Sequence, residues 1–187
     1  MAFLIQRGRG RTGRALFVPV ALLLAARVPV AAQVFKEYEV KAAILYKFAG
    51  FVEWPAAPAG APLCIGVLGH DPFGPALDQA IQGKSINGRP FVIQRFKTGQ
   101  ETGNCQIVFV SSSEKKVLRG ILDRLRREPI LTVGDTPGFC EDGGIVNLEL
   151  ADNRVHFQIN PEAAELARLV VSSKLLSLAG IVHGGTQ

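Results

Sequence analysis

The sequence predicts an α/β domain: a three-layer sandwich in which helices flank a mostly parallel central sheet, with a C-terminal antiparallel β-hairpin. Buried-strand patterns alternate with amphipathic helix patterns over the first two-thirds of the chain, which is typical of a parallel sheet. Two later apolar runs flank a short polar loop at residues 151–153, which predicts the hairpin. Neither repeats nor low-complexity tracts interrupt the pattern, so residues 33–187 are expected to form a single domain.

The first 32 residues have the composition of a secretory signal peptide. Four arginines precede an apolar run at residues 15–26, and the small residues of Val30-Ala31-Ala32 follow it. The apolar run is about a dozen residues long and contains Pro19, whereas a membrane-spanning helix needs roughly 20 apolar residues. We therefore expect residues 1–32 to be cleaved, leaving Gln33 as the first residue; a retained membrane anchor is the alternative. Without an adjacent arginine pair, the general secretory route is the default.

The charge of the chain is concentrated in this leader. The formal net charge of +5 comes from 21 basic and 16 acidic residues, and five of the basic ones lie within residues 1–32. The remaining chain is formally neutral. It has no cationic surplus for phosphate, so nucleic acid is not expected as a partner.

The first expected element after the leader is a helix from Glu37 to Val52 with an aromatic face. Its apolar residues recur at steps of three and four, and the run ends near Trp54-Pro55, as a helix does before proline. The stripe consists of Tyr38, Ala42, Leu45, Phe48 and Val52.

The centre of the chain alternates between strands and helices. Strands are expected at residues 63–68, 91–96, 105–110 and 130–133, and helices at Pro75–Gln82 and after Ser111. Ser111 is followed three residues later by Glu114, which suits a capping box. The second of these helices buries Val117, Leu118, Ile121, Leu122 and Leu125.

The C-terminal third begins with the hairpin, whose strands are expected at residues 145–150 and 154–159. Asn160 and Pro161 then start a helix, with asparagine as N-cap and proline at the first helical position. Gly143-Gly144, just before the hairpin, is interpreted as serving backbone geometry.

Three cysteines in an exported chain suggest a disulfide. Cys64 and Cys105 each lie early in a predicted buried strand. If these strands are neighbours in a parallel sheet, the two cysteines lie at matching ends, within the separation that a disulfide requires. Cys140 is left over as a buried thiol, an intermolecular bridge or a reactive group, of which the first is the commonest.

The search for chemistry gives mostly negative results. His70, His156 and His183 stand singly, without histidine or cysteine at ligand spacing, so neither a metal nor another cofactor is expected. No nucleophile elbow is present, and residues 111–113 fit helix capping better than catalysis. His70, Asp71 and Phe73 follow a predicted strand, where open α/β sheets commonly bind ligands, so they are a candidate ligand or partner cleft.

Several ordered blocks resemble the YfiR-like periplasmic proteins, and together they cover essentially the whole chain after the leader. The opening block, Lys41–Pro55, looks like the signature of the family. The further blocks are Gly69–Gly74, Gly83–Pro90, the strand at Cys105, Ser111–Glu114, Phe139–Asn147, Asn160 and Ser172–Leu176.

The resemblance implies a periplasmic α/β regulator without catalytic activity, often dimeric. It implies that the chain represses an inner-membrane diguanylate cyclase through its periplasmic sensor region, and that an outer-membrane lipoprotein relieves this repression. It also agrees with a Cys64–Cys105 disulfide. Some members carry a second pair that begins near Cys140, but this chain has Asn147 seven residues later. The other hypothesis is a periplasmic small-ligand-binding protein that presents a metabolite to a membrane receptor or transporter.

Overall fold

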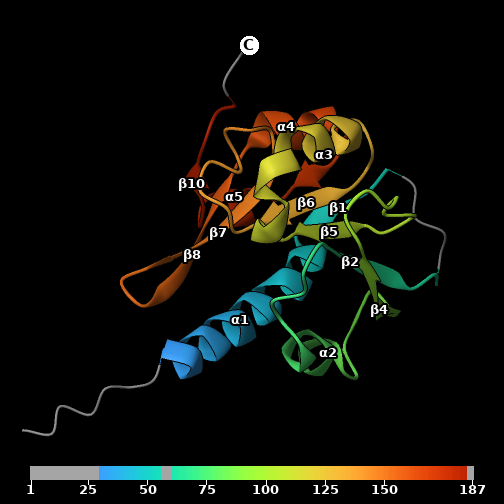
Figure 1. Cartoon of the computed structure of the whole chain (residues 1–187). Coiled ribbons are helices and arrows are strands. Elements are labelled where there is room, and N and C mark those ends of the chain that lie inside the picture. The colour runs from blue at the N-terminus through green and yellow to red at the C-terminus, as the bar shows by residue number, and fades with distance from the viewer. Residues whose placement is uncertain (1–29, 56–59, 185–187) are drawn as a thin grey trace, which may run out of the picture.

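The computed structural model describes residues 30–55 and 60–184, with side chains from residue 36 onward. The leader therefore lies outside the described residues except for its last three positions. Five α-helices are present in the described part: α1 (Val30–Lys47), α2 (Pro75–Ile81), α3 (Leu118–Leu125), α4 (Pro161–Leu166) and α5 (Ser173–Leu176). Two 3₁₀ helices are η1 (Phe48–Gly50) and η2 (Ser112–Val117). Figure 1 shows their arrangement.

An eight-stranded, mostly parallel sheet forms the centre, with strand order β10-β8-β7-β6-β5-β2-β4-β3. Its strands are β2 (Leu63–Leu68), β3 (Ser85–Ile86), β4 (Arg89–Phe96), β5 (Ile107–Val110), β6 (Leu131–Gly134), β7 (Val146–Ala151), β8 (Arg154–Ile159) and β10 (Gly180–Ile181). The five neighbouring strands β7, β6, β5, β2 and β4 are parallel to one another. The predicted α/β class and mostly parallel sheet are confirmed, and the hairpin β7–β8 is a continuous part of this sheet.

Helices cover both faces of the sheet because its central strands are buried throughout. All residues of β2 are buried, and their side chains alternate between two clusters. Ile65 and Val67 belong to a core shared with α1 and α2, whereas Cys64 and Leu68 pack with α3. Figure 1 accordingly shows α1 and α2 on one side of the sheet and α3 on the other.

The predicted helix at Glu37–Val52 has the wrong bounds. The α-helix begins at Val30 and ends at Lys47, and η1 follows it. Strand pairing explains the early end: β1 (Val52–Glu53) forms a separate two-stranded antiparallel sheet with β9 (Val170–Val171). The apolar period continues through Val52, but the backbone there bonds to a strand more than one hundred residues away.

The capping prediction at Ser111 is correct in one half. The Ser111 hydroxyl accepts a hydrogen bond from the Ser113 N–H at 3.3 Å. Glu114 does not complete the box, because its carboxylate accepts from the hydroxyls of Thr98 and Ser113 instead. Residues 112–117 form a 3₁₀ helix before α3 begins at Leu118.

The N-cap at Asn160 is confirmed. Its Oδ1 accepts from the Ala163 N–H at 2.9 Å, while its Nδ2 donates to the Cys140 carbonyl at 2.9 Å. One buried side chain thus starts α4 and ties it to the segment before β7.

No helix in the described part of the chain is long and apolar enough to cross a membrane.

Candidate functional site

The parallel strands β2, β5 and β6 all finish at the same end of the sheet, and several polar segments meet there. Leu68 pairs with Val110, and Val110 pairs with Gly134, so the residues that follow β2, β5 and β6 emerge side by side. These are Gly69, Ser111 and Asp135. Open α/β sheets commonly bind ligands at this carboxyl end of their strands.

A buried carboxylate fixes the segment after β2. The Ser113 hydroxyl accepts from the His70 N–H at 3.0 Å and donates to Glu114 Oε1 at 3.0 Å. Gly69 allows this approach, since its φ is +94° and a Cβ there would lie 2.6 Å from Glu114 Oε1. Glu114 is 4% exposed, and its Oε2 has no partner among the described residues. The loop after β2 is therefore anchored to η2.

The structure assigns different environments to the three residues of the candidate cleft. His70 is exposed. Asp71 caps the backbone of Phe73 with Oδ1 and accepts from Arg95 Nε with Oδ2 at 2.7 Å. Phe73 is buried, with its ring edge-to-face against Tyr38 and Phe109 at centroid distances of 5.5 and 4.7 Å. Only His70 of the three offers a side chain free of the core and of ion pairs; a ligand or partner role for the set stays a prediction.

A buried ion cluster that the sequence analysis missed joins α1 to the end of β6. Lys41 is 3% exposed, and its Nζ lies 3.0 Å from Asp135 Oδ2 and 2.6 Å from Glu37 Oε1. The Tyr38 hydroxyl donates to the same Asp135 oxygen at 2.7 Å. Burial, and next the hydrogen bond to Asp135, raises the pKa of Tyr38, which favours the protonated phenol that donates this hydrogen bond. The spacing of Glu37 and Lys41, four residues apart on one helix, was the available sequence signal.

The disulfide lies near the amino ends of the central strands, at the opposite end of the sheet from the polar segments. Cys64 and Cys105 are bonded, with their Cα atoms 4.5 Å apart, as both the strand argument and the resemblance predicted. Cys105 lies just before β5 and not within it. Gln106 ties the same two segments by accepting from the Cys64 N–H through its side chain and donating its own N–H to the Cys64 carbonyl. A 41-residue sequence separation is thereby closed around β2, α2, β3 and β4.

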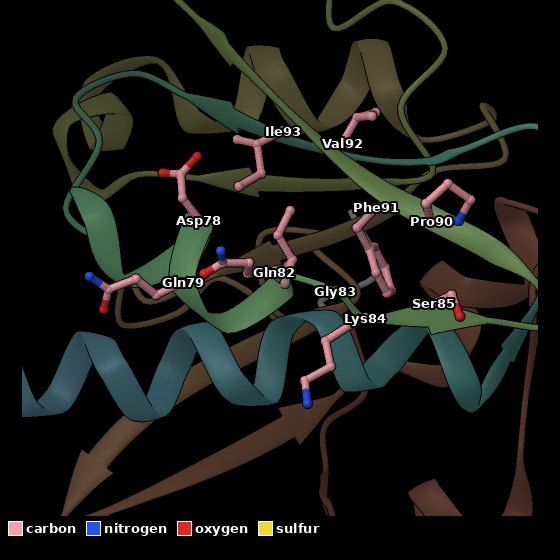
Figure 2. A pocket seen from close by; sticks show the side chains of 11 residues that line it. Asp78, Gln79, Gln82, Gly83, Lys84, Ser85, Pro90, Phe91, Val92 and Ile93 are labelled. Atoms are coloured by element: carbon pink, nitrogen blue, oxygen red, sulfur yellow. The ribbon is translucent and has the colours of Figure 1, made fainter.

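A groove of about 870 Å³ runs between α2 and the outer strands β3 and β4. Figure 2 shows Asp78, Gln79 and Gln82 on the helical side and the residues of β4 on the other side. Its lining is mixed: Ile81, Phe91 and Ile93 supply apolar surface. A smaller cavity of about 210 Å³ is lined by residues that include Trp54 and Arg89.

The comparison with family models decides the classification. The model of YfiR/HmsC-like proteins matches residues 38–180, which is most of the chain. The chain belongs to the YfiR/HmsC-like family. No protein of curated function matches the sequence.

A solved structure supports the fold of this YfiR/HmsC-like chain. It is a conserved domain protein from Vibrio cholerae O1 biovar El Tor strain N16961, which superposes with a TM-score of 0.54 at 10% sequence identity. The match covers 77% of the YfiR/HmsC-like chain and 59% of the Vibrio protein. At this identity the likeness is one of fold.

The third cysteine of this YfiR/HmsC-like chain is a buried free thiol. Cys140 lies close to the carbonyls of Ile145 and Gln158, with Sγ–O distances of 3.7 and 3.8 Å. Asn147, where some members carry the partner cysteine, is fully buried and donates to Glu149 Oε1 at 3.1 Å. Desolvation by burial is the main cause that raises the pKa of Cys140 to about 12.

We expect Cys140 to resist alkylation by iodoacetamide at pH 8 in the folded protein. The thiolate is the reactive form, and both the raised pKa and the burial suppress it. Intact-mass spectrometry of the oxidised protein should show no adduct when native and one adduct in urea, since the other two cysteines are bonded. Rapid labelling of the native protein would contradict the buried position.

Proposed function

We propose that this chain is a periplasmic, non-enzymatic regulator that binds the periplasmic sensor region of an inner-membrane diguanylate cyclase and represses it. Membership of the YfiR/HmsC-like family over residues 38–180 is the observation that carries the proposal. Repression would lower cyclic di-GMP and, with it, biofilm formation. The chain would act as a homodimer. An outer-membrane lipoprotein would release the cyclase by sequestering this regulator.

The periplasm is the proposed compartment. A leader with a basic start, a short apolar run and small residues at its end supports export. The Cys64–Cys105 disulfide supports an oxidising compartment, because such bonds are rare where thiols are kept reduced. The regulator and the sensor region of its partner would then share one space.

Repression by binding needs no chemistry in the regulator, but it needs preference for one conformation of the partner. A ligand shifts a conformational equilibrium only by its difference in affinity for the two states. If the chain binds the inactive state alone, a free concentration 100 times the dissociation constant stabilises that state by about 2.7 kcal/mol. That shift corresponds to a roughly hundredfold change in the ratio of active to inactive cyclase.

The test is to produce the full chain together with each membrane diguanylate cyclase of the same cell that has a periplasmic region. We expect cyclic di-GMP, measured by mass spectrometry, to fall with one of these cyclases. Chain lacking residues 1–32 remains in the cytoplasm and is the control, because it cannot reach the sensor region. Unchanged cyclic di-GMP with every cyclase would refute the proposed function.

A further inference from the structure

The outer strand of the groove has a free edge. β4 pairs with β2 over the whole of Phe91–Phe96. On its other side, β3 reaches only Arg89 and Pro90, through a hairpin turned at Asn87-Gly88. In the described part of the chain, no strand pairs with Phe91–Phe96 on the side away from β2. An edge of this kind can accept a further strand.

The hydrogen-bonding groups on this edge can be assigned by their alternation along the strand. Ile86 and Arg89 flank the two-residue turn, so the backbone of Arg89 faces β3. The Phe96 carbonyl faces β2, where it accepts from the Gly69 N–H at 2.9 Å. The backbone N–H and C=O groups that point away from β2 are therefore those of Phe91, Ile93 and Arg95.

The groove beside this edge offers room for alternate side chains of an added strand. Ile81 on α2 and Ile93 on β4 are both half-buried lining residues. Figure 2 shows Ile93 on the same side of β4 as Asp78, with Lys84 further along the groove wall. Backbone bonds along an edge supply affinity in this mode of recognition, and neighbouring pockets supply specificity.

The charges along the edge are mostly cations. Arg95 is balanced by two carboxylates, Asp71 at 2.7 Å and Asp78 at 2.6 Å. Arg89 donates to the carbonyls of Ala61 and Pro62. Arg89 is therefore held toward the segment before β2, whereas Lys84 and Lys97 are exposed and form no ion pair within the described residues. The edge is thus complementary to an acidic segment.

We propose that the outer edge of β4 binds an extended acidic segment of the partner protein, which adds to the sheet as a further strand. That the segment belongs to the membrane partner rests on the proposed function. A second copy of this chain fits the edge poorly: antiparallel pairing of two β4 strands about Ile93 would bring Lys97 of one copy against Arg89 of the other, at the position that β3 already occupies. Like charges directly opposite each other destabilise strand pairing.

The first test uses a peptide and needs no knowledge of the partner. The probe is the acetylated, amidated peptide Glu-Thr-Val-Thr-Val-Thr-Glu, compared with the same peptide carrying lysine in place of both glutamates. We expect the acidic peptide to slow hydrogen exchange at the amides of Ile93 and Arg95, measured by NMR, and to bind more tightly than the basic one. Equal binding of the two peptides, or protection elsewhere in the chain, would overturn the proposal.

A charge reversal provides the matched variants. Lys84→Glu with Lys97→Glu changes two exposed side chains on the edge, while Lys115→Glu with Lys116→Glu makes the same change on η2. The edge variant should bind the acidic peptide about fivefold more weakly, because it loses two exposed ion pairs, and the η2 variant should bind like wild type. Equal weakening in both variants would mean a general charge effect and would overturn the assigned edge.

The repression assay separates this inference from the proposed function. If wild type represses a cyclase and the edge variant represses it equally well, the edge is not the contact and the proposed function stands. If wild type represses no cyclase while the peptide test succeeds, the strand-binding edge stands and its assignment to a cyclase falls. Loss of repression in the edge variant, with the η2 variant normal, supports both.

Discussion

Removal of the Cys64–Cys105 disulfide should lower the free energy of unfolding by about 2–4 kcal/mol. Closing a 41-residue separation restricts the unfolded chain, and the chain-entropy model assigns about 4 kcal/mol to a loop of this length. The measurement is urea unfolding of the Cys64→Ser/Cys105→Ser variant. Fluorescence of Trp54 reports directly on this region, because its Nε1 donates to the Gln106 carbonyl at 3.2 Å.

Wild type in reducing agent is the control, since it loses the same bond without a substitution. Its midpoint should move to that of the double serine variant. The loss should also be local: loss of the bond should speed hydrogen exchange more at the amides of β4 than at those of β7. The reason is that β4 lies inside the closed loop and β7 lies outside it. A change below about 1 kcal/mol would show that Gln106 and the strand ladder hold this region without the covalent bond.

The second large effect is expected at Lys41, whose replacement by methionine should cost about 3–5 kcal/mol. Methionine fills the same space, but it leaves the carboxylate of Asp135 in a site where its side chain is 3% exposed. Asp135 would keep the Tyr38 hydroxyl at 2.7 Å and lose its charge partner. Removing one partner of a buried pair costs more than the pair itself contributes.

A double-mutant cycle tests this reason. Lys41→Met combined with Asp135→Leu should be less destabilised than the sum of the single variants, since no buried charge then lacks its partner. Lys47→Met is the matched control, because Lys47 lies exposed on the same helix, and should change stability by less than about 0.5 kcal/mol. If Lys41→Met resembles Lys47→Met, the cluster does not anchor α1.

The long elements of this fold were predictable because their side-chain periods are set by burial on one or two faces. β2 was recognised from an unbroken apolar run, and the N-cap at Asn160 from residue types whose chemistry is local. The disulfide followed in the same way from strand adjacency. Short strands such as β3 and β9 were not predictable, since each has two residues and exists through pairing with a distant partner.

The candidate site was harder to predict than the fold. Phe73 follows a strand and was placed in a cleft, but its ring is buried against Tyr38 and Phe109. Burial of Lys41 could not be predicted, because a lysine is ordinarily solvated and only tertiary structure brings Asp135 to it. Gly144 has a packing role, since a Cβ there would collide with the Phe139 ring. In each case the deciding contact is with a residue far away in the sequence or with a bulky neighbour.

The ion cluster at Lys41 also has a consequence for the order in which the chain folds. Lys41 and its partner Asp135 are separated by 94 positions, so α1 cannot complete its anchor until β6 has been formed. Contacts of such long range make folding slow. If the chain is exported as proposed, an N-terminal helix whose anchor depends on so distant a carboxylate would leave the early part of the chain loosely folded until β6 forms, which would suit passage through a membrane before folding.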